Sequence, residues 1–213
     1  MKKYLITTTL LDNYSWFEKA PSSWKERAFN GLMETLTRAP FNPTPEIQRG
    51  IDFEKEVNTM VHATREEFIE QMGQNCAIFY DTCKGAVQQK KLKRELIVDG
   101  WCFQLYGKAD YWFPHLTIDA KTTGNYEKGP KKYLEKTQHL MYAYMEEKPA
   151  FKYLVAVFDS QKAKRPVFVD PIDITVDLAQ AEEEITKRIR SCISFIRNDA
   201  DIKKAYLEKF NWN

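Results

Sequence analysis

The chain has 213 residues, a length that suits a single domain. Hydrophobic residues make up 43% and charged residues 29% of the sequence, the proportions of an ordinary globular protein, which excludes an intrinsically disordered chain. The formal net charge is only +2, so any contact with nucleic acid must depend on local basic clusters. No apolar run reaches the roughly 18 residues of a membrane span, and the first residues lack the apolar stretch of a secretory signal. We therefore expect a cytoplasmic protein.

The first third of the sequence is predicted to be helical. Thr9 and Thr44 can cap helices, and Pro45 favours a first helical turn. The prolines within residues 40–45 exclude a helix there. The expected helices begin at residue 10, span residues 22–38, begin at residue 45 and span residues 64–84.

The middle of the sequence changes to strand patterns. Asp99-Gly100 is a strong hairpin signal between two apolar runs. Strands alternating with helices predict an α/β domain preceded by a helical region. The expected strands cover residues 92–98, 101–106, 116–120, 151–158 and 167–169, and the expected later helices cover residues 131–147 and 178–197.

The spacing of the cysteines and lysines limits the kinds of metal-binding and phosphate-binding sites that the chain can contain. The four cysteines form no C-x-x-C pair, which argues against zinc or iron–sulfur ligation and favours buried free thiols. Each basic cluster is either a solvated face or a track for phosphates. These clusters are Lys84, Lys90, Lys91, Lys93 and Arg94; Lys128, Lys131, Lys132 and Lys136; and Lys162, Lys164 and Arg165.

Two carboxylates and a lysine are predicted to meet near the ends of two neighbouring strands. Asp110 follows the strand over 101–106, while Asp119 and Lys121 end the next strand and share a face because they are two residues apart. A hairpin-like connection can bring Asp110 to the same side. Carboxylate oxygens are preferred ligands of Mg²⁺, which activates a bound water, and a lysine can stabilise developing negative charge. This pattern suits phosphodiester hydrolysis, although a D-x-K sequence on its own is usually a surface ion pair.

The motifs around these residues resemble those of the PD-(D/E)XK nucleases, in particular the RecB-like and lambda-exonuclease-like branches. The acid before the lysine is an aspartate rather than the more frequent glutamate, and no proline precedes Asp110. On the upstream helix, Asp52 and Glu56 are alternatives to Glu54, and Tyr142 is alternatively a core residue. In chain order the matching motifs are Gly50-x-x-x-Glu54, Gly107-x-x-Asp110, Ile118-Asp119-x-Lys121-Thr122 and Gln138-x-x-x-Tyr142.

The resemblance implies a restriction-endonuclease-like α/β/α core with a central mixed sheet and an N-terminal helical subregion. The implied single domain covers residues 1–213, with a mainly helical part (1–90), a catalytic sheet core (91–170) and a C-terminal helical part (171–213). The implied catalytic residues are Asp110, Asp119, Lys121 and Glu54. The implied ligands of Mg²⁺ or Mn²⁺ are Asp110, Asp119, Glu54 and the carbonyl of Ala120. The implied DNA contacts are Gln138, Tyr142, Lys131, Lys132 and Thr122.

The implied function is that of an Mg/Mn-dependent deoxyribonuclease, an exonuclease or end-processing enzyme of phage-type recombination or repair. The alternative is a non-catalytic DNA-binding or assembly protein on the same fold. The intact set of two acids and a lysine favours the nuclease. The resemblance also allows a homo-oligomer and a single-strand annealing protein as a partner. Exonucleolytic and endonucleolytic cleavage, DNA and RNA substrates, and one or two metal ions are all compatible with these motifs.

Overall fold

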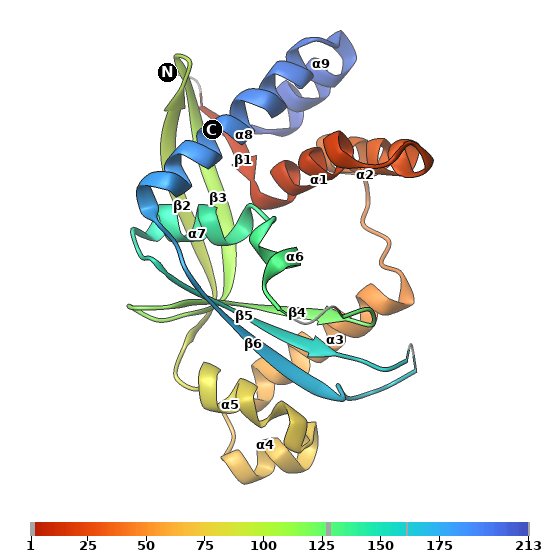
Figure 1. The fold of residues 1–213 in the computed structure, drawn as a ribbon, viewed down its shortest axis with the longest axis vertical. Coiled ribbons are helices and arrows are strands. Elements are labelled where there is room, and N and C mark those ends of the chain that lie inside the picture. The colour runs from red at the N-terminus through yellow and green to blue at the C-terminus, as the bar shows by residue number, and fades with distance from the viewer. Residues whose placement is uncertain (1–2, 127–128, 161, 213) are drawn as a thin grey trace.

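A mixed seven-stranded sheet lies between two groups of helices in the computed structural model, which describes residues 3–126, 129–160 and 162–212 (Figure 1). Helices α1, α2, α7, α8 and α9 pack on one face and share one apolar core with the sheet. Helices α3, α4 and α5 pack on the other face around a second core. This three-layer α/β/α arrangement is the fold class expected from the sequence. No helix in the described part of the chain has both the length and the hydropathy needed to cross a bilayer.

The strands and helices have the following bounds. The strands are β1 (Lys3–Thr7), β2 (Val87–Val98), β3 (Trp101–Trp112), β4 (Thr117–Thr123), β5 (Ala150–Val157), β6 (Phe168–Thr175) and β7 (Asn211–Trp212). The α-helices are α1 (Thr8–Lys19), α2 (Lys25–Thr37), α3 (Pro45–Met60), α4 (Arg65–Met72), α5 (Ala77–Cys83), α6 (Lys131–Leu134), α7 (Gln138–Glu146), α8 (Leu178–Arg197) and α9 (Ala200–Lys209). Two short 3-10 helices, η1 (Ser22–Trp24) and η2 (Gln74–Cys76), precede α2 and α5.

The long strand β3 organises the sheet. The strand order is β6-β5-β4-β3-β1-β7, and β2 pairs with β3 along almost its whole length. On its other edge, β3 pairs in parallel with β1 up to Tyr106 and then antiparallel with β4 from Tyr111. Residues 107–110 of β3 therefore lie in a gap between two partner strands. This gap opens the sheet at the position of the Gly-x-x-Asp motif.

Several expected helices differ in extent from the observed ones. Helix α1 begins at Thr8 because Thr7, not Thr9, is its N-cap: the Thr7 hydroxyl accepts the Leu10 N–H at 3.2 Å. Residues 22–38 form η1 followed by α2 rather than one helix. The helix expected over residues 64–84 is interrupted at Gly73, whose φ of +89° is not helical. The cap of α3 by Thr44 and the extent of α8 are confirmed.

The helix expected over residues 131–147 is broken between α6 and α7. The Thr137 backbone N–H donates to Asp12 Oδ1 at 2.7 Å, and Arg188 donates to the Thr137 hydroxyl at 2.7 Å. Both partners come from distant helices, so the local sequence carries no sign of the break. The break makes Gln138 the first residue of α7.

Strands β2, β3, β4 and β6 are longer than expected, and this changes the positions of the motifs within the strands. Strand β3 continues to Trp112, so Asp110 lies inside it and not after it. Strand β4 runs to Thr123, so Asp119 and Lys121 also lie within a strand. The Asp99-Gly100 hairpin turn is confirmed, with positive φ at both residues. Strands β1 and β7 and helix α9 were not predicted.

Candidate active site

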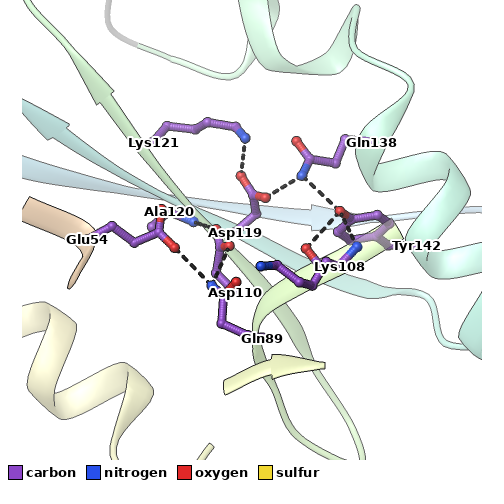
Figure 2. Close-up of polar contacts among 9 residues, drawn as sticks. All are labelled: Glu54, Gln89, Lys108, Asp110, Asp119, Ala120, Lys121, Gln138 and Tyr142. Carbon is purple, nitrogen blue, oxygen red and sulfur yellow. Dashed lines mark hydrogen bonds and ion pairs between the residues drawn. The ribbon is translucent and has the colours of Figure 1, made fainter. Parts of the chain in front are cut away.

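The register between β3 and β4 explains why two acids come together. The last paired residues are Tyr111 of β3 and Ile118 of β4, in an antiparallel register. The next opposed pair is Asp110 and Asp119, and opposed residues on antiparallel strands present their side chains to the same face. The Ala120 N–H, released from pairing with β3, donates to Asp110 Oδ2 at 2.9 Å (Figure 2).

Lys121 reaches the site from the same face of β4 as Asp119. Its ammonium forms an ion pair with Asp119 Oδ2, as the spacing of two residues predicts. The side chain of Asp119 is only 3% exposed, whereas that of Lys121 is 36% exposed. Burial opposes the charge on the lysine, but the charge and hydrogen bond of Asp119 outweigh it and raise the pKa of Lys121. The lysine is therefore a persistent positive charge at the surface of the site.

Glu54 is the acid of α3 that faces the other two. The amide of Gln89 donates to Glu54 Oε1 at 2.9 Å and to Asp110 Oδ1 at 3.2 Å, so one group spans both carboxylates (Figure 2). The two neighbouring acids are engaged elsewhere: Asp52 accepts a hydrogen bond from Gln48, and Glu56 pairs with Arg165. Of these three acids, Glu54 is therefore the one whose carboxylate shares a hydrogen-bond donor with Asp110.

The three carboxylates oppose one another's charge. Burial raises the pKa of Asp110 to about 8, and the charges of Asp119 and Glu54 add to this effect. Burial also raises the pKa of Glu54, again with a contribution from Asp119. Crowded carboxylates of this kind favour a cation, and a set of oxygen donors suits a hard divalent ion.

The carboxylates are not all turned to one point. Within the described residues, no three His, Cys, Asp or Glu side chains form a ready set of metal ligands. Glu54 and Asp110 form a pair through Gln89, while Asp119 faces Lys121 and Gln138. In donor chemistry the three acids fit a divalent ion, and Asp119 would have to serve both such an ion and the lysine.

Gln138 and Tyr142 share one face of α7, as their spacing of four residues predicts. The Gln138 amide donates to Asp119 Oδ1 and, at 3.3 Å, to the Tyr142 hydroxyl. That hydroxyl in turn donates to the Lys108 carbonyl at 3.0 Å and accepts the Lys108 N–H at 3.2 Å (Figure 2). Tyr142 is 3% exposed, so it is both a core residue and the link that holds β3 and Gln138 in place.

Two motif glycines make room for two other motif residues. A Cβ on Gly107 would overlap the ring of Tyr142, and a Cβ on Gly50 would overlap the hydroxyl of Thr122. The four motifs are therefore packed in pairs: the helix of Glu54 against β4, and β3 against α7. The sequence shows the glycines but not which residues fill the space above them.

A pocket of about 400 Å³ opens beside Lys121. It is lined by the start of α1, the end of β4 and the segment around α6, including Lys132 and Lys136 but not Lys131. Lys128 of the same cluster lies outside the described residues. A larger hollow of about 640 Å³ lies between the β2–β3 turn and helices α8 and α9, away from the carboxylates. The smaller pocket is the one that adjoins the candidate site, because Lys121 lines it.

The fold has counterparts among solved structures. The crystal structure of SSO0001 matches with a TM-score of 0.54 and 14% identity over 90% of this chain and 76% of that one. An alkaline exonuclease from Laribacter hongkongensis, LHK-Exo, matches with a TM-score of 0.50 and 13% identity over 95% of this chain and 94% of that one. The chain shares the fold of this exonuclease. A structure of LHK-Exo in complex with dAMP matches likewise, with a TM-score of 0.50 and 14% identity over 91% and 90% of the two chains.

The comparison confirms the fold expected from the sequence motifs. No protein-family model matches the sequence, and no curated protein matches it. The likeness is therefore one of fold, and the activity must be argued from the site itself.

Sequence reasoning missed one residue of the site. Gln89 precedes the strand expected over residues 92–98, lies in no recognised motif, and contacts both Glu54 and Asp110. Its positive φ of 53° gives no signal in the sequence, because glutamine is not a residue that favours this conformation.

Proposed function

We propose that this chain is a metal-dependent deoxyribonuclease that hydrolyses phosphodiester bonds as an exonuclease or end-processing enzyme of phage-type recombination or repair. The observation that carries the proposal is the meeting of Asp110, Asp119 and Lys121, with Glu54 beside them, next to an open pocket. Burying acids so close together costs stability, which a purely structural role does not explain. The exonuclease fold and the dAMP complex of LHK-Exo support a deoxynucleotide strand as the substrate.

The site residues have different roles in the proposed hydrolysis. Glu54, Asp110, Asp119 and the carbonyl of Ala120 would hold Mg²⁺ or Mn²⁺, which supplies a Lewis acid and an activated water. Lys121 stabilises negative charge that develops on the phosphoryl oxygens, since Asp119 keeps its ammonium protonated. No nucleophilic thiol is needed, and all four cysteines are free and buried.

The substrate strand is proposed to cross the pocket beside Lys121. Lys132 and Lys136 line this pocket and supply positive charge for phosphates, and Thr122 lies on its wall. Gln138 is exposed to the pocket and can contact the strand directly. Tyr142 acts through Gln138 and the backbone of Lys108, because its own hydroxyl is already occupied. Lys131 lies on the adjacent surface of α6.

Incubation with end-labelled linear DNA and Mn²⁺ tests the proposal. The wild-type protein should release labelled nucleotides, and Lys121→Ala should abolish cleavage while leaving DNA affinity almost unchanged, because one charge among many contributes little to binding. Lys204→Ala, on the exposed surface of α9, is the matched control and should cleave normally. DNA binding without cleavage by the wild type in Mn²⁺ and in Mg²⁺ would favour the non-catalytic alternative. Wild-type cleavage by Lys121→Ala would show that the ion pair is structural.

A further inference from the structure

Gln89 has a backbone conformation that strand β2 does not otherwise require. The regular pairing of β2 with β3 continues on both sides of it, through Gln88 with Tyr111 and Lys90 with Ala109. At Gln89 itself the pairing is interrupted, and φ is +53°. This left-handed conformation is unfavourable for a residue with a Cβ, and such outliers gather at functional sites.

The side chain shows what the distortion achieves. Gln89 lies opposite Asp110 in the register, and its Nε2 donates to Asp110 Oδ1 at 3.2 Å and to Glu54 Oε1 at 2.9 Å (Figure 2). The two carboxylates come from different layers of the fold, the sheet and α3. One uncharged amide thus occupies the contacts through which these two acids could share a ligand. It also relieves their repulsion, because each acid faces an N–H rather than another oxygen.

The Gln89 amide also lies beside open space. Another pocket, of about 350 Å³, is lined by Glu54, Gln89 and Gln88 together with residues of α3 that include Asn58. This pocket gives the Gln89 amide open space into which it can rotate, away from the two carboxylates.

We propose that Gln89 is a positioning residue that holds the place of the divalent ion: it keeps Glu54 and Asp110 together and gives up both contacts when a cation binds them. The inference rests on the proposed function, which requires a cation at these carboxylates. It has a thermodynamic signature. If the amide leaves on binding, its removal raises the free energy of the ion-free protein alone, so the cation binds more tightly. If the amide instead stays and orients the ligands, its removal weakens binding.

Mn²⁺ titration of Gln89→Met by calorimetry decides between these outcomes. Methionine keeps the unbranched shape and the Cβ of glutamine but removes the donors. We expect the Mn²⁺ dissociation constant to fall by roughly three- to tenfold, the effect of about one net hydrogen bond, and the thermal midpoint in chelator to fall. Gln88→Met is the matched control, since the Gln88 amide donates to the Asn58 carbonyl and not to the carboxylates. Its Mn²⁺ affinity should equal that of the wild type.

Each other result overturns the inference in a different way. An unchanged or weaker affinity in Gln89→Met rejects the placeholder and leaves the proposed function intact. A wild-type protein that binds no Mn²⁺ rejects both. If Gln89→Met does not fold, Gln89→Asn replaces it, because asparagine accepts the left-handed conformation and its shorter amide cannot span both acids. The same tightening of Mn²⁺ binding is expected there, and its absence rejects the inference.

Discussion

The ring of Tyr142 lies directly against the backbone of Gly107, with no space for a Cβ between them. The ring cannot easily move away, because its hydroxyl is hydrogen-bonded to the backbone of Lys108 and the ring lies in a tilted contact with that of Phe151. Gly107→Ala should therefore destabilise the protein by about 1–3 kcal/mol, the usual cost of overpacking a core. The thermal midpoint should fall by roughly 2–4 °C for each kcal/mol.

Gly31→Ala is the control for this substitution. Gly31 lies in α2 and a Cβ there meets nothing within 4 Å. Alanine should stabilise this helix by roughly 0.5–1 kcal/mol. Equal stability of Gly107→Ala and the wild type would show that the contact with Tyr142 is loose.

The contact between Gly50 and Thr122 is tested by a double-mutant cycle. Alanine at Gly50 should favour α3 by about 1 kcal/mol through helix propensity, but its Cβ would overlap the Thr122 hydroxyl. We expect Gly50→Ala to destabilise the wild type and to stabilise the Thr122→Ala variant, as measured by denaturant unfolding. The coupling should be on the order of 1 kcal/mol or more. Additive effects, such as those expected for Gly31→Ala in both backgrounds, would disprove the contact.

The raised pKa of Asp110 predicts how stability depends on pH. Because its folded pKa lies above the unfolded value, the fold favours the protonated acid, and this contribution is lost as pH rises from about 4 to about 8. Asp110→Asn cannot ionise. In chelator, its thermal midpoint should exceed that of the wild type at pH 9, by the equivalent of roughly 1–3 kcal/mol, and the difference should shrink towards pH 4.

Asp81→Asn serves as the comparison of opposite sign. The hydrogen bonds from Arg65 lower the pKa of Asp81, so the stabilisation from this acid is complete above its unfolded pKa and is lost as the pH falls through its folded pKa. The thermal midpoint of Asp81→Asn should not rise relative to that of the wild type as the pH increases. If the thermal midpoints of Asp110→Asn and the wild type change with pH in parallel, ionisation of Asp110 does not destabilise the folded protein.

The pocket beside Lys121 predicts which lysines bind phosphate. Lys132 and Lys136 line it, so removing both should weaken binding to all DNA sequences alike. The slope of log affinity against log salt should flatten by about 0.7–0.9 for each phosphate that the variant no longer neutralises. The double variant Lys131→Ala/Lys132→Ala should show a smaller change in slope, because only one of its lysines lines the pocket.

A fluorescence titration across a salt series measures these slopes. Lys203→Ala/Lys204→Ala, on the exposed surface of α9, removes the same charge and should leave the slope unchanged. An unchanged slope in Lys132→Ala/Lys136→Ala would move the DNA track to the clusters around Lys91 or Lys162.

The parts of the site that could be predicted from sequence are those fixed by local geometry. A spacing of two in a strand placed Asp119 beside Lys121, and a spacing of four in a helix placed Gln138 beside Tyr142. The turn at Asp99-Gly100 followed from its need for positive φ. Each of these features depends only on residues that are close together in the sequence.

The parts that could not be predicted depend on distant partners. The break before Gln138 is held by Asp12 and Arg188, each more than fifty residues away. Strand β1 has only five residues and is defined by pairing with β3. Gln89 contacts Glu54 from a backbone conformation that glutamine disfavours. Local sequence preferences therefore do not predict this contact.

The parallel pairing of β1 with β3 has a consequence for the order in which the site is assembled. Lys3 pairs with Cys102, so this pairing closes a loop of about a hundred residues, and such long-range pairings form late in folding. Helix α1, which follows β1 directly, supplies part of the wall of the pocket beside Lys121. Helices α3 to α5 and the β2–β3 hairpin can form earlier, because their contacts are local. Refolding protein should therefore regain most of its secondary structure before the wall of the pocket beside Lys121 is complete.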